Sequence, residues 1–223
     1  MTQKTSNSDT VKVNILKPFG PRILHAKLPK KTIRMLNEEC DIILKSKSKN
    51  KEDFNHDLLR QVTSDAFQID MREKPTLRDF ALGLGDLTKC LVDEYQKEKN
   101  PNYVNDNTSQ FYMHNAWFVR SFKSDYLPVH LHTSGQFSCV LYLKVPEDIT
   151  EADNKNTQGY IDFIYGSANT VTRGNRTFMP VVGDLYIFPS FLFHTAYPFF
   201  GKGERRSLSA NFSLQVQKGT SSA

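Results

Sequence analysis

The chain of 223 residues is 39% hydrophobic and 12% aromatic, which is enough for one domain with a sizeable core, with or without a helical extension. Its formal net charge of +5 is uneven, because residues 1–60 carry a net +6 and the remainder a net −1. Cys40, Cys90 and Cys139 are odd in number and too far apart for a Cys-x-x-Cys site. They exclude a disulfide framework and predict buried free thiols.

The composition also bears on the partners and the location of the protein. The start of the chain has no apolar signal region, and no apolar run approaches the length of a membrane span. We therefore expect a cytoplasmic protein with no membrane partner. The lysine clusters at Lys27–Lys31 and Lys45–Lys51 have no interleaved aromatic residues, so we interpret them as solvated surface and do not expect nucleic-acid binding.

The first half of the chain predicts mainly helices. Residues 1–10 are polar, and we expect a disordered tail there. Residues 11–16 alternate in polarity, as in a short strand. Apolar residues at helical spacing predict two amphipathic helices, over about 31–45 and about 77–99. Asn100-Pro101 ends the second helix.

The second half changes to short, aromatic-rich strands separated by Pro, Gly and Asn turns. The predicted strands are Phe111–Arg120, Gln136–Val145, Tyr160–Tyr165, Asp184–Phe188, Phe193–Pro198 and Arg205–Gln215. This pattern favours an α+β fold, in which a double-stranded β-helix (jelly-roll) barrel in the C-terminal half is packed by N-terminal helices. We expect a single domain over residues 11–223, with a helical support region at 11–105 and a jelly-roll core at 106–217.

Three histidines form the strongest candidate for a metal site. His130 and His132 are two residues apart, so on a strand both side chains point to the same face. His194 ends an apolar segment, Leu185–Phe193, that could form a neighbouring strand. Neutral imidazole is a ligand for Fe, Zn, Cu and Ni. The alternative is that the pair is satisfied by ordinary hydrogen bonds in the core.

The last predicted strand has one polar and one mostly apolar face. The polar face carries Arg205, Ser207, Ser209 and Asn211, and the other face carries Arg206, Leu208, Ala210 and Phe212. Burying an arginine is costly unless it is paired, and a dicarboxylate ligand would pair with it in bidentate geometry. Two alternatives stay open. The polar face could lie in solvent on an edge strand, or a register slip of one residue could put Arg206 in place of Arg205.

Taken in chain order, the motifs are specific as a set. They are Asn115-Ala116-Trp117, His130-Leu131-His132, the apolar run Ser138–Pro146, the segment Gly183–His194 and Arg205-Arg206-Ser207. Over about residues 111–214 they resemble the iron(II)/2-oxoglutarate-dependent oxygenases, and within them a phage and bacterial branch related to the prolyl hydroxylases.

The resemblance implies that His130 and His194 bind iron. His132 is the third expected ligand, although the usual metal triad has Asp or Glu at this position. Asp162 is the alternative, since a carboxylate from elsewhere could complete the site. No catalytic residue beyond the metal centre is implied.

The resemblance also implies a set of residues that bind the cosubstrate. Arg205 would hold the distal carboxylate of 2-oxoglutarate, with Ser207 beside it. Tyr142 would donate its hydroxyl to the same carboxylate, and Asn115 is the remaining cofactor-binding position.

We therefore expect a non-haem iron(II), 2-oxoglutarate-dependent dioxygenase that uses O2 to hydroxylate a small molecule or a protein residue. The alternative is a cupin-like metal-binding protein or enzyme that does not use 2-oxoglutarate. Cupins also use His-x-His and a later His, but Gln136 stands where they have Glu. Because each imidazole must be neutral to coordinate, metal binding should weaken below about pH 6.

Overall fold

The computed structural model describes residues 12–16, 20–46, 64–104, 109–149 and 156–216. The expected tail at 1–10 and most of the lysine cluster Lys45–Lys51 lie outside these residues. Within the described part, neither helix is long and apolar enough to cross a membrane.

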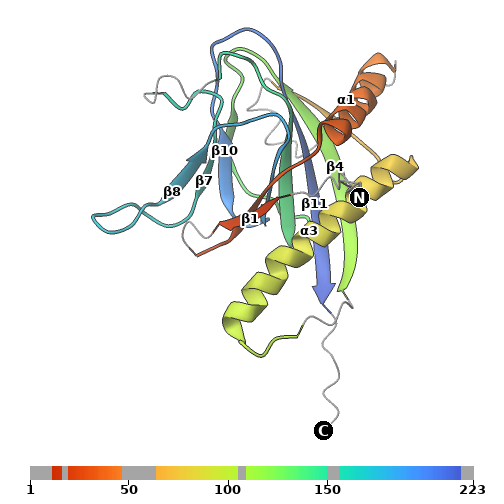
Figure 1. Cartoon of the computed structure of the whole chain (residues 1–223). Coiled ribbons are helices and arrows are strands. Elements are labelled where there is room, and N and C mark those ends of the chain that lie inside the picture. Colours follow the sequence, from red (N-terminus) through yellow and green to blue (C-terminus); the bar gives the residue numbers. More distant parts are fainter. Residues whose placement is uncertain (1–11, 17–19, 47–63, 105–108, 150–155, 217–223) are drawn as a thin grey trace, which may run out of the picture.

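Two antiparallel sheets form the body of the molecule (Figure 1). The larger sheet has the order β1-β2-β9-β6-β11-β4-β3 and the smaller sheet the order β5-β10-β7-β8. The strands of the larger sheet are β1 (Val13–Leu16), β2 (Ile23–Lys27), β9 (Asp184–Pro189), β6 (Phe137–Lys144), β11 (Arg205–Val216), β4 (Ser109–Ser121) and β3 (Asp65–Gln68). Those of the smaller sheet are β5 (Leu127–His130), β10 (Phe193–Ala196), β7 (Ile161–Ile164) and β8 (Asn175–Phe178).

Two helices, α1 (Lys30–Lys45) and α3 (Pro75–Lys99), pack on the larger sheet. Their buried residues, such as Leu36 and Leu84, share one hydrophobic core with the sheet strands. Both helices occur where the apolar spacing predicts them, and α3 ends directly before Asn100. Gly85 lets α3 approach β4 closely, because a β-carbon there would lie 3.0 Å from the Phe111 ring.

A second, smaller hydrophobic core lies between the two sheets. It includes Val140 and Tyr142 from the larger sheet and Ile161 and Phe163 from the smaller one. The arrangement of two facing antiparallel sheets with helices on one outer face confirms the predicted α+β jelly roll.

Some local predictions were incomplete or wrong. The strands β2, β3 and β8 were not predicted. Each has only four or five residues, and β8 is also largely exposed and polar, so it lacks an apolar face. The three thiols are free, as expected, and Cys40 and Cys139 are buried. Cys90 is exposed, so its predicted burial was wrong. It lies on α3, and the face of a helix turned away from the sheet stays in solvent.

Arg206 is a buried residue of β11 that pairs with Asp41 of α1 and with Glu204. The residue is 1% exposed. Its Nε donates to Glu204 Oε1 at 2.7 Å, and its Nη1 donates to Asp41 Oδ1 at 2.8 Å. Glu204 also pairs with Arg120 and Lys144. Arg206 therefore has a structural role beneath the helix.

We predict that Arg206→Met lowers the free energy of unfolding by about 2–3 kcal/mol. This loss of stability should be no larger than is usual when a buried ion pair is broken, because Glu204 keeps two other cationic partners. Urea denaturation measures it. The control is Arg34→Ala, which removes an exposed pair with Glu38 and should change stability by about 0.5 kcal/mol or less. Equal stability of the two variants would contradict a structural role for Arg206.

Candidate metal centre

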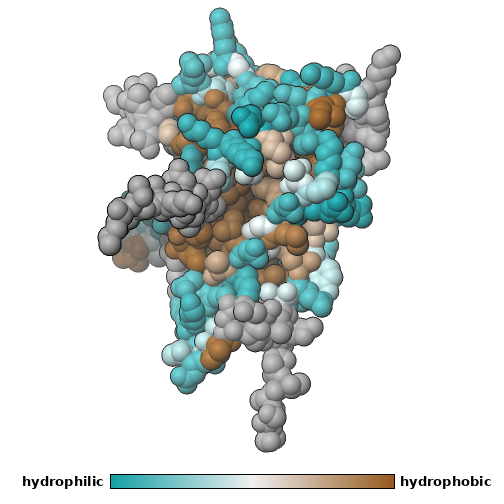
Figure 2. All heavy atoms as spheres, turned by 45° about the vertical axis from the view of Figure 1, so that its right-hand side comes forward, coloured by the Kyte–Doolittle hydropathy of each residue, from teal (hydrophilic) through white to brown (hydrophobic). Residues whose placement is uncertain are grey.

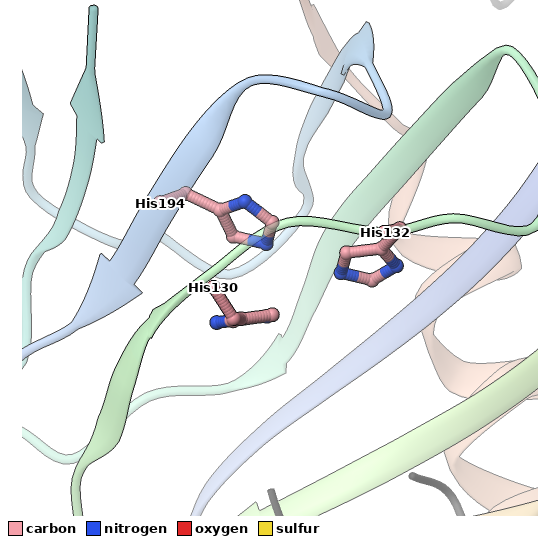
Figure 3. A group of neighbouring side chains, drawn as sticks. All are labelled: His130, His132 and His194. Atoms are coloured by element: carbon pink, nitrogen blue, oxygen red, sulfur yellow. The ribbon is translucent and has the colours of Figure 1, made fainter.

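The three predicted histidines converge between the two sheets (Figure 3). His130 is the last residue of β5 and lies opposite His194 of β10 in the strand register. His132 follows β5 by two residues. One possible ligand atom from each histidine lies within 4.8 Å of the other two. Among the described residues, these three histidines are the cluster that could hold a metal ion. The three side chains could therefore hold one metal ion.

Hydrogen bonds fix which nitrogen of each ring faces its neighbours. The Nδ1 atoms of His130 and His194 each bond to the backbone carbonyl two residues earlier, at 2.8 and 3.0 Å. The Nδ1 of His132 bonds to Asn211 Oδ1 at 2.7 Å. All three partners are acceptors, so each Nδ1 carries the proton and each Nε2 keeps its lone pair. His132 Nε2 is buried and has no hydrogen-bond partner in the described part of the chain. This is the state in which imidazole coordinates a metal.

Burial keeps the three rings neutral. It lowers the pKa of His130, and it lowers the pKa of His132 to about 4 with a further contribution from neighbouring His130. Burial and the two other histidines hold the pKa of His194 well below its usual value of 6.5. Neutral imidazoles offer lone pairs without prior loss of a proton.

The local structure around His132 differs from the expected regular strand. β5 ends at His130, and the His132 amide donates instead to the Ser190 carbonyl at 2.9 Å. Leu131, expected on the opposite face, also lines the cavity described below. The convergence thus depends on contacts with the turn after β9 as well as on strand alternation.

The structure does not bring Asp162 to the histidines. Its carboxylate accepts hydrogen bonds from Asn175, Thr177 and Tyr197. Its neighbour Phe163 faces the histidines instead, with its ring 6.1 Å from that of His194. Alternation on β7 therefore turns the carboxylate away.

A cavity of about 470 Å³ adjoins the three histidines. One face of the molecule shows an apolar hollow between hydrophilic rims (Figure 2). The cavity is lined by the whole predicted polar face of β11, namely Arg205, Ser207, Ser209 and Asn211. Tyr142 and Asn115 line it too. β11 lies in the middle of the larger sheet, so the alternative of a solvated edge strand was wrong.

Arg205 is a buried cation without a carboxylate partner among the described residues. It is 4% exposed. Its Nη1 donates to the carbonyls of Gly159 and Tyr197 at 2.8 and 3.0 Å, and its Nη2 donates to Ser121 Oγ at 3.4 Å. Burial lowers the pKa of the guanidinium, whereas nearby Tyr142 and Asp125 raise it. An anion in the cavity would offset the cost of burying this charge.

Tyr142 supplies a hydroxyl on the same wall. It lies opposite Ser207 in the register of β6 and β11, and it is 2% exposed. Burial raises the pKa of Tyr142 to about 12, so the hydroxyl stays protonated and can donate. Asn115 Oδ1 is buried without a partner among the described residues. Each side chain predicted to bind a cosubstrate therefore lines one cavity, and Arg206 does not.

Sequence reasoning missed several residues of the site. Trp117 was noted in a motif without a role, yet its ring stacks on His132 with centroids 5.4 Å apart. Asn211 lay on the predicted polar face, but its bond to His132 was not foreseen. Ala66 and Gln68 of β3 also line the cavity, and no sequence pattern had indicated that short strand.

One family model matches part of the chain. Residues 115–211 match the family described as "Putative 2OG-Fe(II) oxygenase". Among solved structures the chain resembles a prolyl-4-hydroxylase from Pseudomonas putida, with 18% identity, a TM-score of 0.54 and coverage of 83% of this chain and 87% of that chain. No curated protein matches the chain.

Two further structures show the same fold. HygX from Streptomyces hygroscopicus, crystallised with nickel and 2-oxoglutarate bound, is 11% identical with a TM-score of 0.51, over 85% of this chain and 82% of that chain. SnoK, a non-heme alpha ketoglutarate dependent carbocyclase from nogalamycin biosynthesis, is 11% identical with a TM-score of 0.58, over 85% of this chain and 78% of that chain.

Because the pKa values of the three histidines are lowered, metal binding should withstand a more acidic pH than the sequence alone suggested. Because burial lowers the pKa of His132 to about 4, its ring stays neutral well below the usual histidine pKa of 6.5. We predict that bound Co²⁺ is retained as the pH falls through about 6 and is released only as it approaches about 4. A pH titration of cobalt absorbance measures this. Release near pH 6.5 would show that the rings titrate as exposed histidines do.

The same titration has a matched control. His114 bonds to Ser213 on the exposed side of β4 and is not part of the histidine group. His114→Ala should leave the release curve unchanged, whereas His194→Ala should abolish tight cobalt binding.

Proposed function

Because residues 115–211 match the 2OG-Fe(II) oxygenases and the chain has their jelly-roll fold, we propose that the protein is an iron(II)- and 2-oxoglutarate-dependent dioxygenase that hydroxylates its substrate. The observation that carries the proposal is one cavity that joins three inward-facing imidazoles to a buried arginine, which has no carboxylate partner among the described residues. We also propose that residues 11–223 form one oxygenase domain.

The residues of the cavity fit both groups. His130, His132 and His194 would hold iron through their free Nε2 atoms, since each Nδ1 is already bonded. A site with three protein ligands leaves coordination positions for a cosubstrate and O2. Imidazole nitrogens are ligands that suit iron.

Arg205 would hold the distal carboxylate of 2-oxoglutarate. The guanidinium is fixed by two backbone carbonyls, which orient it without neutralising its charge. The protonated hydroxyl of Tyr142 would donate to the same carboxylate. Ser207 is placed beside it on β11, and Asn115 lines the same cavity from β4. Together these groups would fix one orientation of the cosubstrate before O2 enters.

When bound, iron and 2-oxoglutarate supply the oxidative chemistry, in which O2 oxidises 2-oxoglutarate to succinate and CO2 and provides the oxygen for a C–H bond. The protein's contribution is to position the reactants and to exclude water. The buried walls of the cavity, including Val140 and Phe188, serve the second purpose.

A histidine at position 132 changes the net charge of the metal centre. A neutral ring replaces the carboxylate of the usual triad, so three neutral ligands leave the full charge of the ion in place. That charge would strengthen the attraction for the anionic cosubstrate. The cupin alternative has no corresponding use for Arg205, and the family match also favours the oxygenase.

We predict that Arg205→Ala raises the Kd for 2-oxoglutarate by about 10²-fold, because a buried charge pair worth roughly 3 kcal/mol is lost. Calorimetry on the metal-loaded protein measures it. Arg176→Ala, which removes an arginine next to Phe178 on the exposed strand β8, is the control and should have no effect. A change of less than about threefold in the Arg205 variant would contradict the anchoring role.

The direct test of the function is succinate and CO2 formation by the iron-loaded protein given 2-oxoglutarate and O2. Turnover should occur slowly without substrate and faster with a productive one from a panel of peptides, amino acids and small metabolites. His194→Ala should abolish it. Absence of turnover with every member of the panel, in a protein shown to bind both iron and 2-oxoglutarate, would refute the proposed activity.

A further inference from the structure

Three buried polar side chains form a hydrogen-bonded chain that ends on His132. Ser138 Oγ donates to Asn211 Oδ1 at 2.7 Å, and Asn211 Oδ1 also accepts from His132 Nδ1 at 2.7 Å. Ser190 Oγ lies 3.0 Å from Ser138 Oγ. Since Ser138 uses its one hydroxyl proton on Asn211, Ser190 must be the donor in that pair. The chain thus runs from Ser190 through Ser138 to Asn211, where it meets His132.

These side chains are almost inaccessible. Ser138 is 0% exposed, Ser190 is 3% exposed and Asn211 is 4% exposed. Burying polar groups in a core is unfavourable unless they are paired. Here the hydrogen bonds form one continuous path that ends on the His132 ring. Among the described residues, the bonds of Ser190 and Ser138 lead through Asn211 to the His132 ring.

The hydrogen-bonded side chains also connect the segment that carries His132 to the segment that carries His194. The Ser190 carbonyl accepts from the His132 amide at 2.9 Å, and the Ser190 amide donates to the Gln136 carbonyl at 2.9 Å. Ser190 begins the turn that leads from β9 to His194 in β10. His132 is therefore held at both its backbone and its ring, although it lies beyond the end of β5.

His132 differs from the other two histidines in what holds its Nδ1. His130 and His194 use nearby backbone carbonyls, which no side-chain substitution removes. His132 depends on a side-chain amide from β11, a strand 79 residues later in the chain. Its tautomer and its orientation can therefore be changed by mutation at a site that does not touch the metal.

We propose that Asn211, supported by Ser138 and Ser190, is a positioning residue that fixes His132 as the Nδ1–H tautomer and so presents Nε2 as the third metal ligand. The Asn211 amide oxygen accepts the hydrogen bond from the His132 ring without adding charge. The hydrogen-bonded side chains therefore hold the ring in place while the three metal ligands stay neutral. The inference rests on the proposed metal site. According to this inference, the hydrogen bond from His132 to Asn211 lets a histidine act as the metal ligand where the usual triad has a carboxylate.

The test compares Asn211→Ala, Asn211→Asp and Ser138→Ala with the wild type, and Ser213→Ala is the control on the same strand. Two properties are measured on the full chain: the His132 tautomer in the metal-free protein, by ¹⁵N NMR of the imidazole, and the Kd for Co²⁺, with its absorbance spectrum. Asn211→Ala should weaken cobalt binding by about 10- to 100-fold and allow the Nε2–H tautomer. Asn211→Asp keeps an oxygen acceptor in the same place, so it should retain the Nδ1–H tautomer of His132.

Ser138→Ala covers the case in which the alanine variant at 211 fails to fold. It leaves the bond from Asn211 to His132 but removes its support, so we expect a smaller loss of cobalt affinity, of about 3- to 10-fold. Ser213→Ala removes an exposed bond to His114 and should change neither property. Thermal unfolding of each variant separates loss of stability from loss of positioning.

The outcomes distinguish this proposal from the proposed function. A wild-type tautomer and a cobalt Kd within twofold of wild type in folded Asn211→Ala would overturn the positioning role. So would a fall in thermal stability alone, with tautomer and spectrum unchanged. If the wild type binds no cobalt, the metal site fails, and the NMR measurement on the metal-free protein still decides whether Asn211 sets the His132 tautomer.

Discussion

Strand β11 has to satisfy two opposite environments at once, and the rest of the structure depends on this constraint. It lies between β6 and β4 in the larger sheet, so both of its edges are paired, while one face meets the core beneath the helices and the other meets the cavity. Leu208 and Ala210 pack beneath the helices, while Ser209 and Asn211 line the cavity. Because side chains alternate along a strand, a shift of one residue would put every one of them in the wrong environment.

The two adjacent arginines at the start of β11 show how firmly this register is set. Arg206 lies on the helix side, where carboxylates from Glu204 and α1 pair with it. Arg205 lies on the cavity side, where it donates hydrogen bonds to two carbonyls and a hydroxyl. Identical side chains thus have different roles because their partners differ. One holds the helix to the sheet, and the other keeps a charge available inside the cavity.

The metal centre follows from the same separation of faces. The smaller sheet supplies His130 and His194, and the larger sheet supplies the side chain that holds His132 in place. Burial keeps all three rings neutral, and acceptors on each Nδ1 direct the lone pairs inward. Neither sheet alone would form the site. Its geometry therefore depends on how the two sheets pack.

The sequence by itself determined the pattern-based features. Helical spacing located α1 and α3, alternation gave the two faces of β11, and the order of motifs indicated the histidines and Arg205. Helical spacing and strand alternation are local, because each depends on residues close together in the chain, whereas the motif order was informative through the resemblance to a known family. The strand β8 was missed because it is largely exposed and polar, so no apolar face marks it in the sequence. The short strands β2 and β3 were missed as well.

The tertiary structure alone decided which long-range pairs form. The choice of Arg205 over Arg206 for the cavity required the register of β11 within its sheet. The position of Asp162 away from the histidines required the pairing of β7 with β8 and β10. The bond from Asn211 to His132 joins residues 79 positions apart. Such contacts arise from the packing of whole sheets, and no local pattern of residue types encodes them.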